Sequence, residues 1–315
     1  MKKKFSIVFM GTPDFAVPCL NILAEQNHEL PLVITQPDRP RGRGKKMQPP
    51  PVKTAAQALG LEVYQPESMK TQTVIEKLIS IQPDLFVVVA FGHKLSKDIL
   101  DIPAIYPINI HASLLPRYRG SSPVQAAILN RDRETGVTAM VMDQGLDTGD
   151  ILMTARTPVS PEETAESLHD RLAKMGAELI IKTLDAIADQ RITPVPQPHD
   201  LASFAPLLKK EDGRIDWTLE PERIDALVRA MNPWPGAFTF LDNKRLKIFS
   251  VRKSTKKTDM PPGTVFSFEN GQIHVAVKNG AIGISELQGL SGKRLKADQF
   301  LRGKKLDPGT RLGQF

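Results

Sequence analysis

Short apolar runs alternate with amphipathic segments through the first half of the chain. The runs predict buried strands at residues 5–10, 32–35, 84–90 and 105–110, and the segments between them predict helices at 15–25, 52–59 and 73–81. Strands and helices in this alternation predict an α/β fold with a doubly wound, mostly parallel, Rossmann-like sheet. In such a sheet the ligand site lies at the carboxyl ends of the strands.

The rest of the chain has other patterns. Residues 137–142 and 151–157 predict two strands that bracket a polar loop, and residues 165–187 predict one long amphipathic helix. Later apolar stretches are short, alternate with polar residues and are separated by turn signals such as Asn270-Gly271. Together with a helix at 221–231, they predict a small β-barrel, and the oligonucleotide-binding fold is one option.

The length of 315 residues suits two domains. Residues 191–206 contain four prolines, which predicts an extended linker between a first domain at 1–190 and a second at 207–315. The net charge of +7 is unevenly divided, because residues 206–315 carry 20 Lys and Arg against 12 Asp and Glu, whereas residues 1–205 carry 22 against 23. A basic domain beside a near-neutral one suggests a polyanionic partner, and nucleic acid is the first candidate.

Several features limit the class of protein. Cys19 is the one cysteine and lies in an apolar stretch, so we expect a core residue, no internal disulfide and a reducing cytoplasm. The apolar run at 5–10 is too short for a signal peptide or a membrane span. Gly11 follows the first strand without the further glycines of a dinucleotide-binding turn, which argues against a dehydrogenase. We expect a cytoplasmic monomer without membrane contact.

A strongly basic segment follows the second predicted strand. Residues 36–46 contain five cations among two glycines and two prolines: Arg39, Arg41, Arg43, Lys45 and Lys46. Such a segment cannot form the interior of a helix or strand and is too basic to bury, so we expect an exposed loop. Two interpretations stay open, a solvated surface loop or an arm that approaches phosphates.

Three polar residues point to chemistry at the strand ends. Asn109 and His111 alternate along the fourth predicted strand, so both side chains leave the same face of the sheet. Asp147 lies in the next polar loop, and its carboxylate can hold one imidazole nitrogen while the other takes part in proton transfer. Each residue alone has an ordinary structural interpretation. Together they form a candidate catalytic set.

Several motifs give this set a more specific interpretation. They are Phe9-Met10-Gly11-Thr12-Pro13-Asp14-Phe15, Thr35-Gln36-Pro37-Asp38-Arg39-Pro40, Gly42-Arg43-Gly44-Lys45-Lys46, Asn109-Ile110-His111 with Ser113-Leu114-Leu115-Pro116, Gly145-Leu146-Asp147-Thr148-Gly149-Asp150, Ile215-Asp216-Trp217 and Asn232-Pro233-Trp234-Pro235. In these motifs, and over essentially its whole length, the chain resembles the methionyl-tRNA formyltransferase family. The Asn-x-His and Asp motifs are similar to those of the wider group of enzymes that use 10-formyltetrahydrofolate, whereas the basic loop and basic domain point to tRNA.

The resemblance implies an enzyme that moves the formyl group of 10-formyltetrahydrofolate to the α-amine of initiator methionyl-tRNA, without a metal. It implies a catalytic role for Asn109, His111 and Asp147. It assigns folate binding to Phe91, Gly92, Ser113, Leu114, Leu115, Pro116 and Asp143, and tRNA binding to Arg39, Arg43, Lys45 and Lys46.

The chemistry of formyl transfer suits these residue types. An α-amine with a pKa of roughly 8 is partly neutral near neutral pH, so stabilising the oxyanion and moving one proton to N10 are the harder tasks. Asn109 can donate to the oxyanion, an effect worth about 3 kcal/mol, and Asp147 can orient His111. Two roles stay open for His111, proton relay or oxyanion donor.

Two rival functions have less support. A formyltransferase or hydrolase with a small-molecule acceptor would have no evident use for the basic domain. A non-catalytic RNA-binding protein would not need Asn109, His111 and Asp147 together. Trp234 lies next to two prolines, and we expect a core residue at the interface between the domains rather than one that stacks on a base.

Overall fold

The computed structural model describes residues 3–41, 44, 46–289 and 292–313 of the chain. They form two compact units. The first unit contains Met1–Pro123, Glu134–Pro158 and His169–Pro206, and the second contains Val124–Arg133, Val159–Leu168 and Leu207–Phe315. The proline-rich residues 191–206 therefore cluster with the first unit.

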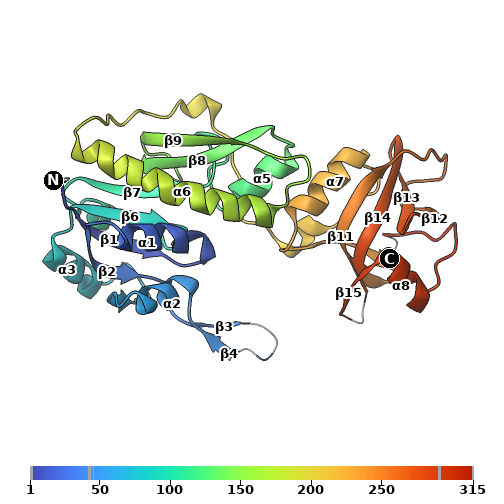
Figure 1. Cartoon of the computed structure of the whole chain (residues 1–315), viewed down its shortest axis with the longest axis horizontal. Helices are drawn as coiled ribbons and strands as arrows, with labels where there is room; N and C mark the ends of the chain where they lie inside the picture. The colour runs from blue at the N-terminus through green and yellow to red at the C-terminus, as the bar shows by residue number, and fades with distance from the viewer. Residues whose placement is uncertain (1–2, 42–43, 45, 290–291, 314–315) are drawn as a thin grey trace. The chain divides into compact units, whose positions relative to one another are not determined.

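The first unit is built on a seven-stranded sheet in the order β5-β2-β1-β6-β7-β8-β9 (Figure 1). The strands are β1 (Ser6–Gly11), β2 (Glu29–Ile34), β5 (Val63–Tyr64), β6 (Leu85–Val89), β7 (Tyr106–His111), β8 (Glu134–Val141) and β9 (Ile151–Pro158). The five strands from β5 to β7 in this order pair in parallel. β8 pairs antiparallel with both of its neighbours, β7 and β9. The strand order reverses beside β1, which confirms the predicted doubly wound, mostly parallel sheet.

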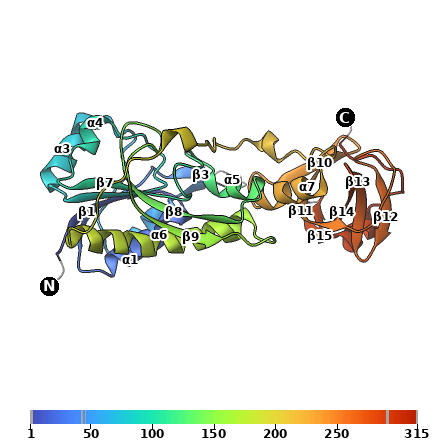
Figure 2. The same ribbon diagram turned by 90° about the horizontal axis from the view of Figure 1, so that it is seen from above.

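Helices cover both faces of this sheet. α1 (Val17–Ala24) and α6 (Ala165–Ala188) lie on one face, and α3 (Gln72–Ile81) and α4 (Lys97–Leu100) lie on the other (Figure 2). The short 3-10 helix η1 (Asp14–Ala16) precedes α1, and α2 (Pro51–Ala58) packs beside α1. The long helix and the three helices predicted in the first half are thus confirmed to within a few residues, whereas α4 was not predicted.

The packing of the core explains why the central strands could be predicted from the sequence. All five residues of β6 are buried, and Phe86 packs with Leu78 of α3 and Ile99 of α4. A strand buried on both faces needs an unbroken apolar run, because neither face meets water. Truncating a buried side chain such as Phe86 to Ala costs about 3–5 kcal/mol.

The basic segment departs from its prediction. β3 (Arg39–Arg41) pairs antiparallel with β4 (Lys46–Gln48) as a short two-stranded hairpin, which we call the basic hairpin. The sequence predicted a loop without strands, and that was wrong for these residues. The predicted exposure is confirmed for Arg39 and for all of β4. A two-stranded ribbon can pair its backbone without burying side chains, so its sequence needs no alternation of apolar and polar residues from which it could be predicted.

The second unit contains a six-stranded antiparallel sheet. β10 (Ala237–Leu241), β11 (Lys244–Ser254), β14 (Gly280–Gln288), β13 (Gln272–Val277) and β12 (Val265–Glu269) follow one another in that order, and β15 (Arg294–Lys296) pairs with β14. The helices are α5 (Pro123–Leu129), α7 (Pro221–Ala230) and α8 (Ala297–Gly303), and η3 (Lys210–Gly213) precedes α7. The predicted smaller antiparallel β domain is confirmed.

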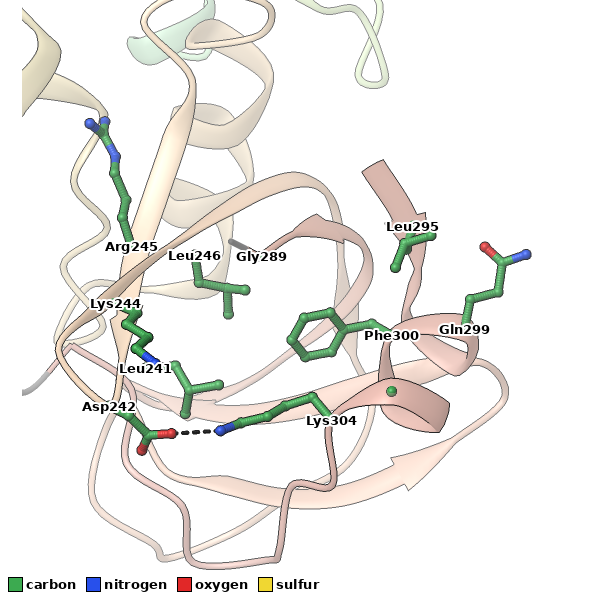
Figure 3. Close-up of a pocket in the computed structure, with 11 residues that line it drawn as sticks. Leu241, Asp242, Lys244, Arg245, Leu246, Gly289, Leu295, Gln299, Phe300 and Lys304 are labelled. Carbon is green, nitrogen blue, oxygen red and sulfur yellow. Dashed lines mark hydrogen bonds and ion pairs between the residues drawn. The ribbon is translucent and has the colours of Figure 1, made fainter. Parts of the chain in front are cut away.

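The C-terminal segment links the two edge strands of this sheet. The N–H of Gly309 donates to the carbonyl of Val265, which begins β12, and the N–H of Gly313 donates to the carbonyl of Phe240 in β10, both at 2.8 Å. The edges are thereby joined through irregular backbone, as in a barrel. A cavity of about 340 Å³ lies in this unit between Leu241, Leu246, Leu295 and Phe300, with Lys304 paired to Asp242 at its rim (Figure 3).

Candidate active site

β7 presents two polar side chains on the face opposite α6. A Cβ added to Gly176 of α6 would lie 2.9 Å from Cγ2 of Ile110, so α6 packs against the face that carries Ile110. Asn109 and His111 flank Ile110 in the strand and therefore face the other side. His111 is the last residue of β7, so both side chains lie near the carboxyl end of an inner strand.

Unpartnered polar atoms gather at the same edge of the sheet. In the described part of the chain, they include Oδ1 of Asn109, Oγ1 of Thr35 and Nε2 of His93, all buried. Thr35 follows β2, His93 follows β6 and Asn109 lies in β7, so the three come from parallel strands near their carboxyl ends. Leaving a buried polar atom unpaired costs about 1–3 kcal/mol, so a polar ligand that pairs with these atoms is favoured here.

The imidazole of His111 is held from both sides. Its buried Nε2 lies 3.0 Å from the carbonyl oxygen of Tyr118, and its Nδ1 lies 3.6 Å from Oδ2 of Asp147. A carbonyl only accepts hydrogen bonds, so Nε2 is the donor of that contact. The ring nitrogen available for proton exchange is Nδ1, on the side of the carboxylate. The sequence had suggested that the nitrogen opposite the carboxylate would be the reactive one.

Asp147 reaches His111 from an unexpected direction. β8 runs antiparallel to β7, and its last residue, Val141, pairs with Ile108, three residues before His111. The loop after β8 must therefore return toward the carboxyl end of β7 before Asp147 can meet His111. Asp147 adopts a left-handed φ of 53°, and its Oδ2 accepts a 2.7 Å hydrogen bond from the N–H of Gly120. The carboxylate is thus held by two contacts.

The segment that follows β7 is closed by its own hydrogen bonds. The hydroxyl of Ser113 donates to the carbonyl of Arg117 at 2.6 Å. The hydroxyl of Thr138 in β8 donates to the carbonyl of Ser113 at 2.7 Å and accepts from the N–H of Leu115 at 3.2 Å. Ser113 and Thr138 are fully buried, so the Ser113 hydroxyl serves the loop rather than acting as a nucleophile.

Phe91 and Gly92, two of the residues assigned to folate, follow β6. The carbonyl of Phe91 accepts from Oγ1 of Thr12 and from Nε2 of Gln36. Gly92 has a φ of +80°, and a Cβ there would lie 2.5 Å from Nε2 of Gln36, so this turn requires glycine. Both residues lie at the edge of the sheet that carries the unpartnered atoms.

The other residues assigned to folate lie in the two loops around His111 and Asp147. Leu115 is buried, Leu114 and Pro116 are half-buried beside it, and Ser113 is bonded as described. We call residues 142–150, between β8 and β9, the Asp147 loop. Asp143 accepts from the hydroxyl of Thr148 at 2.6 Å and closes this loop on itself. Folate binding by these residues stays a prediction.

The basic hairpin carries two of the four predicted tRNA contacts, Arg39 and Lys46, and both are exposed. Arg43 and Lys45 lie outside the described residues. Burial and the charge of Arg39 lower the pKa of His93 from its ordinary value. The hairpin therefore begins near His93, whose Nε2 is one of the unpartnered atoms of the site.

A polar cluster anchors the base of the hairpin. The ammonium of Lys53 lies 2.9 Å from both carboxylate oxygens of Asp38, and Nε2 of Gln65 donates to the same carboxylate at 2.8 Å. Gln65 also donates to the carbonyl of Gln36 at 2.7 Å. The hydrogen bonds from Gln65 and Lys53 hold the pKa of Asp38 below its ordinary value of 3.8.

Two residues of the site were not found from the sequence, Arg119 and Gln197. Both are 3% exposed, and Nε2 of Gln197 donates to the backbone carbonyls of Asp147 and Gly149. Gln197 lies between prolines in the predicted linker, where nothing in the sequence marks it. For Arg119 the one available signal was its place next to Gly120, a few residues after His111.

Other expectations have mixed outcomes. Cys19 is buried as predicted, and burial raises the pKa of its thiol to about 12, which leaves it unreactive. Trp234 is 52% exposed, so the expectation of a core residue was wrong. Among the described residues, no helix is long and apolar enough to cross a membrane, and no group of His, Cys, Asp or Glu side chains could hold a metal ion.

Comparison with known proteins covers both units. Residues 3–184 match the formyl transferase family, and residues 207–305 match the formyl transferase C-terminal domain. The chain is 50% identical over 308 residues to methionyl-tRNA formyltransferase of Geotalea uraniireducens, covering 98% of both chains. It is 48% identical to that of Geobacter sulfurreducens, covering 98% of this chain and 96% of that one.

Solved structures show the same fold at low sequence identity. HypX from Aquifex aeolicus in complex with tetrahydrofolic acid is 18% identical and has a TM-score of 0.64, covering 98% of this chain and 51% of HypX. The match to full-length relatives is the more specific finding. The chain therefore belongs to the methionyl-tRNA formyltransferase family.

Proposed function

We propose that the chain transfers the formyl group of 10-formyltetrahydrofolate to the α-amine of initiator methionyl-tRNA, with Asn109, His111 and Asp147 as catalytic residues. The observation that supports this residue assignment is the position of Asp147. Its Oδ2 lies 3.6 Å from Nδ1 of His111 and 2.7 Å from the N–H of Gly120. An imidazole beside a carboxylate, with a nearby amide whose oxygen is unpartnered among the described residues, suits proton transfer at an acyl centre.

His111 moves the proton in this proposal. Formyl transfer removes one proton from the amine and adds one to N10 of the folate. Nδ1 is the ring nitrogen for this task, because Nε2 donates to the carbonyl of Tyr118. Oδ2 of Asp147 lies 3.6 Å from Nδ1, and its negative charge favours a proton on that nitrogen. The two groups form one proton-handling unit.

Asn109 stabilises the charge that develops on the formyl oxygen. Its amide is fixed in β7, and its buried Oδ1 has no hydrogen-bond partner among the described residues. Rotating the terminal amide by 180° exchanges Oδ1 and Nδ2, so the same position can present a donor. A preorganised donor of this kind contributes about 3 kcal/mol to the transition state.

The basic parts of the chain bind the tRNA in this proposal. Arg39, Arg43, Lys45 and Lys46 approach the acceptor end, and the excess positive charge of residues 206–315 binds phosphates elsewhere. We propose residues 1–190 as the formyl-transfer domain, 191–206 as the connecting segment and 207–315 as the tRNA-binding domain. The proposed working state is a cytoplasmic monomer.

The test is a direct assay with a competing acceptor. Purified protein is incubated with 10-formyltetrahydrofolate and either charged initiator methionyl-tRNA or free methionine. We expect N-formylmethionine to be released by alkaline hydrolysis of the tRNA product, with little formylation of free methionine. Equal use of both acceptors would favour a small-molecule formyltransferase, and formate release without transfer would favour a hydrolase.

A further inference from the structure

The proline-rich segment contacts both loops of the active site. We call residues 195–205 the strap. Val195 and Ile151 exchange backbone hydrogen bonds of 2.8 and 2.9 Å at the end of the Asp147 loop. Arg119 exchanges two 2.8 Å backbone hydrogen bonds with Ser203 and Ala205 of the strap. One length of chain therefore joins the loop of Asp147 to the loop that follows His111.

Close packing confirms that the strap is part of this region. Gly120 has a φ of +117°, and a Cβ there would lie 2.7 Å from the carbonyl oxygen of Ala205. The N–H of Gly120 is the group that donates to Asp147. The strap thus leaves room only for glycine at the residue that holds the carboxylate.

The buried side chain of Gln197 reaches from the strap to the backbone of the Asp147 loop. Its Nε2 donates to the carbonyl of Asp147 at 3.0 Å and to the carbonyl of Gly149 at 2.7 Å. Its Oε1 accepts from Nε and from a terminal nitrogen of Arg119, at 3.1 and 2.6 Å. Both amide hydrogens and the amide oxygen of Gln197 are therefore used.

The orientation of this amide is determined by its neighbours. A flipped amide would put the NH₂ group against the guanidinium of Arg119, which has only donors, and the oxygen against two carbonyls, which only accept. Both sets of contacts would be lost together. Arg119 thereby selects the orientation in which Gln197 can hold the loop, and His199 of the strap lies 3.1 Å from the same guanidinium.

The held backbone is one that needs support. Asp147 adopts the left-handed conformation at a φ of 53°, which is unfavourable for a residue with a Cβ. The loop also presses Gly149 onto β8 so closely that no side chain would fit. Gln197 binds the carbonyls at both of these residues and thus fixes the direction in which the Asp147 carboxylate points.

We propose that Gln197, oriented by Arg119, is a positioning residue for formyl transfer. It holds the backbone of Asp147 so that the carboxylate meets Nδ1 of His111 and the N–H of Gly120. Gln197 touches neither substrate in this proposal, and it acts only through Asp147. The inference rests on the proposed catalytic role of Asp147 and extends the site into the connecting segment.

The test uses Gln197→Met, which keeps the length of the side chain and removes its hydrogen bonds. We expect kcat to fall by about 10- to 100-fold, because small displacements of a reacting group are costly. The KM values for the folate and for the tRNA should stay within about twofold, since no substrate contact is lost. Gln197→Glu is the second variant, because it keeps an acceptor for Arg119 and loses both donors to the loop. It should lose the same activity.

A matched control separates positioning from general stability. Thr183 is fully buried in α6, and its hydroxyl donates to the carbonyl of Leu179 at 2.8 Å, away from the loops of the site. Thr183→Val removes one buried hydrogen bond and should lower the melting temperature without lowering kcat. A fall in kcat proportional to the fall in melting temperature across all three variants would overturn the positioning role.

A double-mutant cycle tests the part played by Arg119. If Arg119 acts through Gln197, Arg119→Met should lower kcat, and the double variant with Gln197→Met should be no slower than the slower single variant. Losses that multiply in the double variant would overturn the proposed orientation by Arg119. Unchanged kcat in both Gln197 variants, with an active wild-type enzyme, would overturn the proposal itself. An inactive wild-type protein would contradict the proposed function instead.

Discussion

The Asp147 loop and the basic hairpin are both polar loops beside the same sheet, but they are held in different ways. Asp147 is bound through its carboxylate by Gly120 and through its backbone by Gln197. The basic hairpin is anchored at its base through Asp38, while its cations at Arg39 and Lys46 are exposed. One loop is held by buried hydrogen bonds, and the other presents exposed charge.

This difference predicts which kinetic constant each loop controls. Buried hydrogen bonds fix reacting groups to within fractions of an ångström and are little affected by salt. Exposed cations attract phosphates over about 10 Å, and salt at about 0.1 M already screens them. We therefore expect changes in the Asp147 loop to alter kcat, and changes in the basic hairpin to alter the productive use of tRNA in a salt-dependent way.

The largest effect is expected for Asp147→Ala. Loss of the carboxylate leaves Nδ1 of His111 without its partner, so kcat should fall by about 100- to 10,000-fold, the range of general acid-base catalysis. Binding of tRNA should change little, as measured by filter retention under conditions in which no formyl transfer takes place. Asp189→Ala, at an exposed residue paired with Arg191, serves as the control. A loss of tRNA affinity without a loss of kcat would contradict the proposed difference between the two loops.

Asn109→Ala is expected to have the next largest effect. Removing a donor to a developing oxyanion lowers kcat by about 100- to 1,000-fold. Asn109→Asp keeps the shape of the side chain and replaces the amide with a group that cannot donate when ionised. Equal losses in the two variants, measured by single-turnover formylation, would support the donor role, whereas an active Asn109→Asp variant would refute it.

The two loops also differ in how well they can be predicted from sequence. β1 and β6 were predicted because strands buried on both faces need continuous apolar residues. In β7 the shared face of Asn109 and His111 follows from the two-residue period of a strand. The contact between Gln197 and the Asp147 loop joins residues that are distant along the chain through one amide. No periodic pattern marks such a contact, because it depends on the tertiary fold.

Exposed structure was the other source of error. The side chains of the basic hairpin whose burial is described, at Arg39, Pro40 and residues 46–48, are exposed, so they leave no hydrophobic alternation in the sequence. Trp234 was expected in a core because large aromatic side chains usually bury most of their surface, yet it is 52% exposed. The rule that apolar side chains are buried therefore located the sheet but failed at Trp234, whose side chain faces solvent.

Arg43→Ala tests the basic hairpin as a whole. Loss of one charged hydrogen bond to a phosphate should lower kcat/KM for methionyl-tRNA by about tenfold. The deficit should shrink as salt is raised, because the wild-type contact is screened, whereas the deficit of Asp147→Ala should not. Steady-state assays across a salt series measure both. An equal loss with a small amine acceptor would assign the segment to folate binding or stability.

The smallest effect is expected for Asp38→Asn, which weakens the anchor of the basic hairpin without removing a cation. Hydrogen bonds from Gln65 and Lys53 lower the pKa of Asp38 in the folded protein. The ionised carboxylate therefore stabilises the hairpin at pH above the ordinary value of 3.8, and this stabilisation is lost as the pH falls through the lowered pKa. At pH 7 we expect kcat/KM for methionyl-tRNA to fall by about two- to fivefold, because the half-buried Lys53–Asp38 pair lies near the surface and is weak.

The pH dependence of the hairpin distinguishes an anchor from a phosphate contact. Amide hydrogen exchange in β3 and β4 should be faster in Asp38→Asn than in the wild type at pH 7, and the two proteins should converge as the pH falls through the lowered pKa of Asp38. If Asp38 instead lay next to the bound tRNA, Asp38→Asn should raise kcat/KM, because removing a negative charge from a phosphate-binding surface would strengthen tRNA binding. A higher kcat/KM for tRNA in Asp38→Asn would mean that the basic hairpin contributes only its positive charge, and that anchoring by Asp38 does not matter.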